Sequence, residues 1–199
     1  MPEVSIISVG PGRFAEVARE VAALRIEVFR SFPYLYDGDL AYEEKYLATY
    51  ARSERAVWVL ARAGDRIVGA STGLPLADEE PAFQAPFEAA GWDIGRVFYF
   101  GESVLLSEYR GHGIGHGFFD HREAHARAFG AYTHTAFAAV DRAEDDPRRP
   151  PGHRDLDGFW RGRGYEKHPE LRMKLGWKEL GEREESDKTL TFWLRALAQ

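Results

Sequence analysis

Arg110-Gly111-His112-Gly113-Ile114-Gly115 has glycine at every second position, and Gly117 continues the pattern. The stretch follows the β-type apolar run 97–106 and precedes the segment 114–129, whose apolar residues recur at helical spacing. Glycine at a strand-to-helix junction permits positive φ and lets a ligand approach the backbone closely. The free N–H groups and the dipole of a new helix favour an anion. The stretch therefore predicts an anion-binding loop that opens a helix.

Two other phosphate-binding loops do not fit these residues. A P-loop needs Gly-Lys followed by Ser or Thr, and the sequence contains no such triplet. A Rossmann loop needs the spacing G-x-G-x-x-G, whereas the third glycine here falls one residue off and the loop lies in mid-chain. The plain alternative is a glycine-rich turn without a ligand, for which four glycines would cost backbone entropy.

Composition limits the class of protein. The chain has 199 residues, of which 44% are hydrophobic and 14% aromatic, enough for a buried core. A formal net charge of -6 argues against nucleic acid as the main partner. The absence of Cys excludes disulfides, thiolate nucleophiles and Cys-based metal sites. No segment is typical of a signal peptide or a membrane span, so we expect a soluble cytoplasmic protein without a membrane partner.

The hydropathy pattern predicts one α/β domain over residues 1–199 with a central mixed sheet. We expect strands at 4–9, 56–61, 67–76, 97–106, 132–140, 170–177 and 189–194. We expect helices at 14–29, 40–50 and 114–129, and short ones within 78–92 and before Gly164. A long, charged and proline-rich loop is expected at about 141–157.

The glycine loop also resembles a known signature. Tyr109-Arg110-Gly111-His112-Gly113-Ile114-Gly115 is similar to the [R/Q]-x-x-G-x-[G/A] acetyl-CoA motif of the GNAT N-acetyltransferases, with Arg110, Gly113 and Gly115 at its fixed positions. Phe159-Trp160-Arg161-Gly162-Arg163-Gly164-Tyr165 resembles the family's later L-Y-x-x-x-G-F motif. The resemblance extends over nearly the whole chain. It implies the GNAT acyl-CoA N-acyltransferase fold: a twisted, mixed, mostly antiparallel sheet flanked by helices.

The resemblance also implies a reaction and a set of cofactor contacts. The reaction would be direct transfer of an acetyl group from acetyl-CoA, the cosubstrate, to a primary amine of a small molecule or peptide in a ternary complex. The strand at Val104, Leu105 and Leu106 would meet the pantetheine, and a backbone N–H near Leu105 would meet the oxyanion. The further expected contacts are Arg110, Gly111, His112, Gly113, Ile114, Gly115, His116 and Trp160.

Trp160 departs from the family pattern. Many members have a tyrosine at this position that protonates the leaving thiolate, and an indole cannot titrate. The general acid would then be another residue, a water molecule, or dispensable. A non-catalytic acyl-CoA-binding or regulatory module is therefore the alternative function. An oxidoreductase with a degenerate dinucleotide loop is a third.

Direct transfer needs a group that deprotonates the amine. Glu102 is the first candidate, because a carboxylate between Phe100 and Val104 on one strand face would be desolvated, which raises its pKa. His134 is the second candidate, since it lies within an expected strand near the point where the sheet should separate. Glu102 could equally have a structural role, and a lone histidine on a strand is more often structural or exposed. Tyr165 is a candidate acid, and Tyr99 is another.

An aromatic loop is the candidate acceptor site. Phe32, Tyr34 and Tyr36 lie next to Asp37 and Asp39, a combination that would suit a cationic amine. The alternative is a packed, solvated loop. The aromatic residues of the last two expected strands would also be compatible with a homodimer.

Histidines recur on the helix that follows the glycine loop. His121 and His125 are four residues apart, as are His112 and His116. The first pair does not form H-E-x-x-H, and no third ligand follows at a suitable spacing, so no metal site is expected. His112 and His116 are instead candidate donors to a phosphate.

Overall fold

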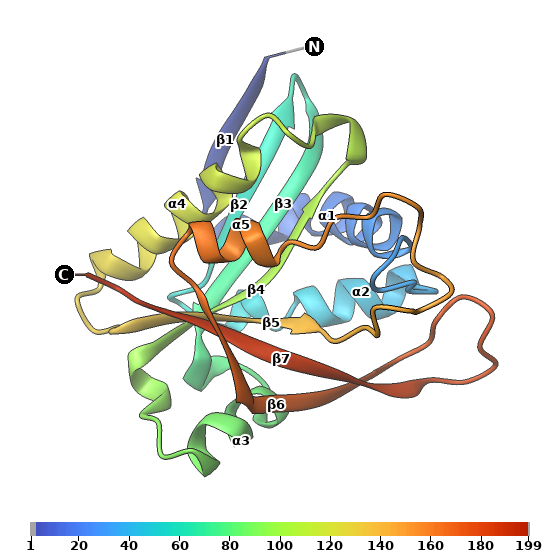
Figure 1. Ribbon diagram of the computed structural model, residues 1–199. Helices are drawn as coiled ribbons and strands as arrows, with labels where there is room; N and C mark the ends of the chain where they lie inside the picture. The colour runs from blue at the N-terminus through green and yellow to red at the C-terminus, as the bar shows by residue number, and fades with distance from the viewer. Residues whose placement is uncertain (1–2, 199) are drawn as a thin grey trace.

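The computed structural model describes residues 3–198, whose strands form one seven-stranded sheet in the order β1-β2-β3-β4-β5-β7-β6. Every neighbouring pair is antiparallel except β4 and β5, which are parallel. The strands are β1 (Val4–Val9), β2 (Val57–Ala63), β3 (Arg66–Pro75), β4 (Val97–Leu105), β5 (His134–Val140), β6 (Glu166–Trp177) and β7 (Ser186–Ala196). The sheet is strongly twisted (Figure 1), and the expected mixed, mostly antiparallel architecture is confirmed.

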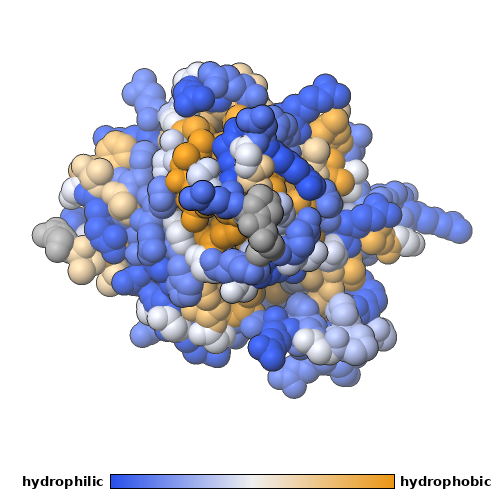
Figure 2. Space-filling model, turned by 90° about the horizontal axis from the view of Figure 1, so that it is seen from above, coloured by the Kyte–Doolittle hydropathy of each residue, from blue (hydrophilic) through white to orange (hydrophobic). Residues whose placement is uncertain are grey.

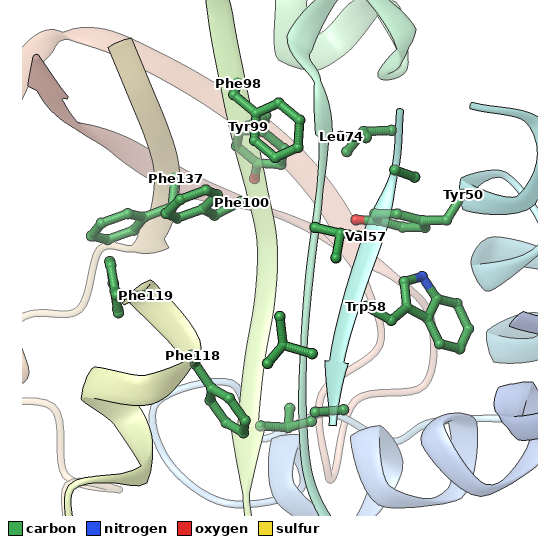
Figure 3. Close-up of a cluster of buried hydrophobic side chains, with 14 of the residues drawn as sticks. Tyr50, Val57, Trp58, Leu74, Phe98, Tyr99, Phe100, Phe118, Phe119 and Phe137 are labelled. Carbon is green, nitrogen blue, oxygen red and sulfur yellow. The ribbon is translucent and has the colours of Figure 1, made fainter. Parts of the chain in front are cut away.

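Helices cover both faces of the sheet. They are α1 (Phe14–Phe29), α2 (Leu40–Leu47), α3 (Pro81–Ala89), α4 (Ile114–Ala128) and α5 (Asp157–Gly162). Figure 3 shows α4 on one side of strands β2 to β4, and α1 and α2 on the other side. Among the described residues, no helix is both long enough and apolar enough to cross a membrane.

Several predicted bounds differ from the observed ones. The second helix ends at Leu47, and a 3₁₀ turn follows at Tyr50–Arg52. Strand β6 begins at Glu166, four residues before the expected start at 170, and its pairing with β7 is irregular between His168 and Arg172. Pro169 lies inside this irregularity, and proline has no N–H to donate to a neighbouring strand. The expected strand starts just after this proline, whereas the observed edge strand passes through it.

Aromatic side chains fill the core on both faces of the sheet. On the α1 side, Phe14 stacks on Trp58 with ring centroids 4.5 Å apart. On the α4 side, Phe119 packs edge-on against Phe100 and Phe137, each at 5.8 Å. Figure 3 shows Trp58 on one side of the strands and Phe119 with Phe137 on the other. The aromatic residues therefore fix α1 and α4 to opposite faces of the same three strands.

Strand β4 contains a β-bulge. Gly73 of β3 is paired with Phe100, and Ser71 with Ser103, so that Thr72 alone lies opposite both Gly101 and Glu102. A bulge interrupts the alternation of side chains along a strand. It therefore changes which face of the sheet each following residue of β4 reaches.

Gly101 is required by the packing at the bulge. A Cβ atom at this position would overlap the hydroxyl of Tyr50 and would lie 2.6 Å from Thr72 Oγ1. Tyr50 is fully buried, and its ring packs against Trp58. The bulge and the buried tyrosine are therefore interdependent.

Strands β4 and β5 separate immediately after they meet. Their pairing is confined to Val97–Tyr99 of β4 and His134–Ala136 of β5. Beyond these residues, no strand within the described part of the chain lies beside the β5-facing edge of β4, and the two ribbons diverge (Figure 1). The backbone of β4 is therefore accessible to a ligand in the segment that contains the bulge.

We expect Gly101→Ala to lower the free energy of unfolding by about 1–3 kcal/mol, the usual cost of overpacking a buried site. In a Tyr50→Phe background the cost should be smaller, because the overlapping hydroxyl is gone. Denaturant unfolding of the four proteins of this double-mutant cycle measures the coupling. Equal costs in the two backgrounds would show that the hydroxyl does not impose glycine at this position.

Candidate functional site

The glycine loop ends in a left-handed residue at the start of α4. Gly113 is the N-cap, with φ 80°, and Gly111 also has φ 80°. The first hydrogen bond of the helix runs from Gly117 N–H to the carbonyl of Gly113. The N–H groups of Ile114, Gly115 and His116 therefore precede the helical hydrogen bonds and point away from the N-terminus of the helix.

The four glycines serve different purposes. A Cβ atom at Gly111 or Gly113 would meet no atom within 4 Å, so positive φ, and not crowding, favours glycine there. Gly117 is different, because a Cβ atom would overlap Cδ1 of Ile6 on strand β1. The alternating pattern thus combines an open loop with a close contact between α4 and β1. The interpretation of all four glycines as parts of a ligand loop is wrong for Gly117.

Basic and aromatic side chains surround the start of α4. Arg110 is exposed, and its Nε donates to the carbonyl of Leu105 at 3.2 Å. His112 is exposed as well, while His116 packs against Phe159 of α5 with ring centroids 4.9 Å apart. No acidic residue lies in the first turn of α4. This end of the helix therefore fits an anionic group.

The glycine loop lies at the end of the molecule that carries the β2–β3 hairpin (Figure 1). Viewed from this end, hydrophobic residues are visible near the middle of the surface, with hydrophilic residues around them (Figure 2). A ligand with both an anionic and an apolar part would find both kinds of surface on this face.

A buried carboxylate joins α4 to α5 and β7. Glu123 accepts hydrogen bonds from Arg195 Nη1 at 2.9 Å and from Arg163 Nη2 at 3.2 Å. The hydroxyl of Tyr165 donates to the same carboxylate at 3.2 Å and lies 2.8 Å from Thr135 Oγ1. Burial raises the pKa of Tyr165. These contacts indicate a structural role for Tyr165 and do not favour it as a catalytic acid.

Glu102 lies on the α1 face of the sheet, within a buried ion-pair cluster. Arg25 of α1 reaches Glu102 Oε2 with Nη1 at 2.6 Å and donates a short hydrogen bond to Glu43 of α2. The contact with Glu102 is ionic, since neither carboxylate oxygen accepts an aligned hydrogen bond from the described residues. One guanidinium thus faces two buried carboxylates.

Because of the bulge, the surroundings of Glu102 differ from those predicted. Phe100 points to the α4 face, where the guanidinium of Arg122 lies 4.2 Å from its ring centroid. Ser103 is also on that face, since its hydroxyl accepts from Arg122 at 2.9 Å. Glu102 is therefore not flanked by Phe100, although burial does raise the pKa of its carboxyl as expected. The positive charge of Arg25 opposes that increase.

Arg122 holds the bulge from the opposite face. Its Nη1 donates to the carbonyls of Thr72 and Glu102, each at 3.2 Å, and its Nε donates to Phe118 within α4. The side chain is 1% exposed, and within residues 3–198 it forms no ion pair. Burial lowers its pKa to about 10. A buried arginine thus connects α4 directly to the backbone that carries Glu102.

His134 lies at the paired end of β4 and β5, before they separate. It is opposite Val97, packs edge-on against Trp92 at 5.0 Å, and shares a hydrogen bond of 3.0 Å with Thr133. Burial, together with nearby His168, lowers its pKa. The structure does not bring His134 and Glu102 together, and its contacts favour a packing role.

The aromatic loop divides into two parts. Tyr34 is partly buried beside Trp177, with ring centroids 5.9 Å apart; burial raises its pKa to about 12, and nearby Arg25 acts in the opposite direction. Burial also raises the pKa of Tyr36, whose hydroxyl lies by Glu43. Phe32 packs instead against His153 at 4.8 Å. Tyr34 and Tyr36 therefore face the cluster around Glu102, whereas Phe32 contacts the long loop.

A second ion-pair cluster connects three loops, and no local sequence pattern predicts it. Arg142 and Arg148 of the long loop both contact the buried Glu179, Arg148 at 2.5 Å. Arg142 Nε also donates to the carbonyl of Pro33 at 2.7 Å. The backbone N–H of Asp37 donates to Lys178, next to Glu179. The long loop is therefore bound to the aromatic loop and to the β6–β7 connection.

The remaining predicted cofactor residues line the separation of β4 and β5. Val104 and Leu106 are buried, and the Leu105 side chain faces α4 near Phe118. Trp160 packs on the β5 side, 5.0 Å from Phe137 and 5.1 Å from Trp193. The indole of Trp160 packs against these two rings, and neither ring can supply a proton to the leaving thiolate.

A further cleft of about 780 Å³ lies at the far end of β3, beside the C-terminal end of α4 and away from the glycine loop. Its lining includes Arg52, Arg55, Asp78, Glu79 and Glu80. Tyr50 reaches Glu79 from inside, with its hydroxyl 3.4 Å from Oε1. No group of three or more His, Asp or Glu side chains that could hold a metal ion occurs among residues 3–198.

Comparisons with solved structures agree on the fold. A ribosomal-protein-alanine N-acetyltransferase from Brucella melitensis has 15% identity and a TM-score of 0.61, covering 97% of this chain and 99% of that chain. yncA from Salmonella typhimurium, with its cofactor acetyl-CoA, has 10% identity and a TM-score of 0.60, covering 98% and 95%. Arabidopsis thaliana NAA60, in complex with acetyl-CoA, has 10% identity and a TM-score of 0.61, covering 98% and 99%.

Sequence comparisons place the chain in a family. A search of curated proteins finds no significant match. The sequence model of the acetyltransferase (GNAT) family matches residues 21–149, which is more than half of the chain. This range includes the bulge, the glycine loop and α4. The chain therefore belongs to the GNAT acetyltransferase family.

Proposed function

We propose that this protein is an N-acetyltransferase that moves the acetyl group of acetyl-CoA to a primary amine by direct transfer in a ternary complex. One observation carries the proposal. The bulge in β4 directs buried Glu102 to one face of the sheet, next to the segment where β4 separates from β5. The open N-terminus of α4 follows the same strand on the other face. A base and an anion site are thus held by one strand and the loop after it.

The cofactor would use the residues around the separated strands. The diphosphate fits the free N–H groups of Ile114, Gly115 and His116, supported by exposed Arg110. Each contact with the helix dipole contributes roughly 0.3–1 kcal/mol. The pantetheine would lie along the unpaired edge of β4 towards Glu102. Acetyl-CoA supplies an activated thioester, so the protein needs only to orient the amine and remove its proton.

Glu102 would accept the proton of the bound ammonium. Burial raises the pKa of its carboxyl, and the charge of Arg25 keeps this increase in check. A base with a pKa closer to the working pH transfers protons more effectively. The carboxylate form is the active one, so kcat/KM should rise with pH through a pKa above the ordinary range of glutamate.

The acceptor would be a small molecule or a peptide with a primary amine. Tyr34 and Tyr36 provide aromatic surface beside Glu102 and Glu43, and these two carboxylates exceed the single charge of Arg25. An excess of buried negative charge favours a cationic acceptor. The thiolate would take its proton from the acceptor nitrogen or from water, because the indole of Trp160 does not titrate.

The apolar surroundings of Trp160 favour one other function, a non-catalytic acyl-CoA-binding module. A thiol-release assay with acetyl-CoA and a panel of amines and peptides separates the two. Amine-dependent release of free CoA supports the transferase. Tight binding of acetyl-CoA with no release for any acceptor would support the module.

We expect Glu102→Gln to lower kcat by about 10²- to 10⁴-fold, the usual contribution of a positioned general base. Acetyl-CoA affinity should change little, because the side chain lies on the α1 face. Steady-state thiol release and calorimetry measure the two quantities, and Glu88→Gln, on the exposed surface of α3, serves as the control. Normal turnover of Glu102→Gln across the pH range would remove Glu102 as the base.

Gly113→Asp should weaken acetyl-CoA binding by about a hundredfold or more, because like charges placed together cost several kcal/mol. The matched control is Gly130→Asp, which introduces the same side chain at positive φ in the loop beyond α4. Both variants place an aspartate at positive φ and so carry similar backbone strain. The difference between their acetyl-CoA affinities, measured by calorimetry, therefore reports the effect of a negative charge at one end of α4 or the other. Equal affinities would contradict the assignment of the diphosphate to α4.

A further inference from the structure

Each transfer leaves a proton that must return to water. An ammonium group and acetyl-CoA give an amide, a thiol and one additional proton, which Glu102 would hold after the reaction. This inference rests on the proposed function. The Glu102 side chain is only 3% exposed, and both of its oxygens are buried. Its proton therefore needs a route through neighbouring groups if the acceptor side is closed by bound ligands.

Two of the neighbouring directions are blocked. On the α1 side, Arg25 lies between Glu102 and Glu43, and a guanidinium stays protonated in proteins. On the α4 side, Arg122 donates to the backbone carbonyl of Glu102 and not to its carboxylate. Neither arginine can pass a proton onward.

Hydroxyl groups at the bulge offer a third direction. Glu102 N–H donates to Thr72 Oγ1 at 3.3 Å. The space that a Cβ atom of Gly101 would occupy is shared by Thr72 Oγ1 and the Tyr50 hydroxyl, so these two oxygens lie side by side. The Thr72 hydroxyl also lies close enough to stabilise the charged forms of Glu102 and Tyr50, although burial is the larger influence on the pKa of each.

The chain of hydroxyl groups ends at Glu79. The Tyr50 hydroxyl donates to Glu79 Oε1 at 3.4 Å, and the backbone N–H of Glu80 donates to Oε2 at 3.0 Å. Glu79 is 8% exposed, and its remaining surface lies on the cleft at the far end of β3. The carboxylate thus touches both the buried tyrosine and a water-accessible space.

We propose that Thr72, Tyr50 and Glu79 form a proton relay from Glu102 to the water of this cleft. The Glu102 proton passes to the Thr72 oxygen while the Thr72 proton passes to Tyr50. The Tyr50 proton passes to Glu79, which releases it to water, so every hydroxyl group regains one proton. Within residues 3–198 the Glu102 carboxylate has no aligned hydrogen-bond partner, so its protonated form must first turn to donate to Thr72 Oγ1 while the Thr72 O–H points at Tyr50.

The charges around Glu79 suit this role. Burial raises its pKa to about 7, while the hydrogen bonds from Glu80 N–H and Tyr50 act in the opposite direction. Glu102 and the Glu80 carboxylate add to the increase. The neighbouring Tyr46 and Tyr99 have raised pKa values through burial, so they remain neutral near pH 7. A group that titrates near neutral pH can both accept and release a proton there.

The test compares the first turnover with later ones. In Glu79→Gln, Glu102 begins as a carboxylate, so the first acetyl transfer in a stopped-flow experiment should proceed at the wild-type rate. Steady-state turnover in dilute buffer should fall on the order of tenfold to a hundredfold, at or below the lower end of the range for a lost proton-transfer group. Concentrated imidazole should restore it, because a small buffer can enter the cleft.

Two more variants make the result specific. Tyr50→Phe interrupts the relay before Glu79, so its first turnover should be as fast as in the wild type and its steady-state turnover should be slow. Imidazole should restore its steady-state rate less than it restores the rate of Glu79→Gln. Glu54→Gln alters an exposed carboxylate in the same cleft and should behave like the wild type. Circular dichroism verifies that all variants fold.

Wild-type steady-state rates in both Glu79→Gln and Tyr50→Phe, with Glu102→Gln inactive, would overturn the relay and leave the proposed function intact. A slowed first turnover would also overturn it, since that result would place Glu79 in the transfer itself. Absence of thiol release from the wild type with every amine would overturn the proposed function, and the relay with it.

Discussion

The face of the sheet that Glu102 reaches is set by a contact between a backbone and a side chain. Gly101 has no Cβ atom, so the hydroxyl of Tyr50 lies directly against β4, and the strand bulges by one residue. Arg122 holds the carbonyls of the bulge from the opposite face. Without the bulge, Glu102 would share a face with Phe100 and would point at α4. Because of this arrangement, the proposed base Glu102 lies on one face of β4 and the proposed cofactor helix α4 lies on the other.

The distribution of buried charged side chains between the two faces of the sheet follows from the same geometry. The α1 face collects Glu43 and Glu102 around Arg25, and the α4 face collects arginines around Glu123. An excess of carboxylate on one side and of guanidinium on the other suits a cationic acceptor and an anionic cofactor, respectively. The sheet between them keeps the two ligands apart except where β4 and β5 separate. At that point an amine and a thioester could meet.

The sequence predicted what local patterns determine. The glycine loop, the helix after it and the order of strands were visible, because positive φ and apolar periodicity leave local signals. The face of the sheet to which Glu102 points could not be predicted. It depends on a bulge, and the bulge depends on the contact of Gly101 with Tyr50, some fifty positions earlier in the chain. Gly117 was misread for the same reason, since its contact with Ile6 connects distant segments. Tyr165 matched a motif position, but its hydroxyl is engaged by a carboxylate of another helix.

An amide-resolved NMR titration of the ¹⁵N-labelled protein with CoA tests most directly whether the cofactor binds at the start of α4 and along β4. We expect the largest shifts at the N–H groups of Ile114, Gly115 and His116 and along β4 from Glu102 to Leu105. Gly130, at the opposite end of α4, should stay unchanged. Shifts confined to the cleft beside Glu79, with α4 and β4 unaffected, would contradict the assignment of the cofactor to the separated strands.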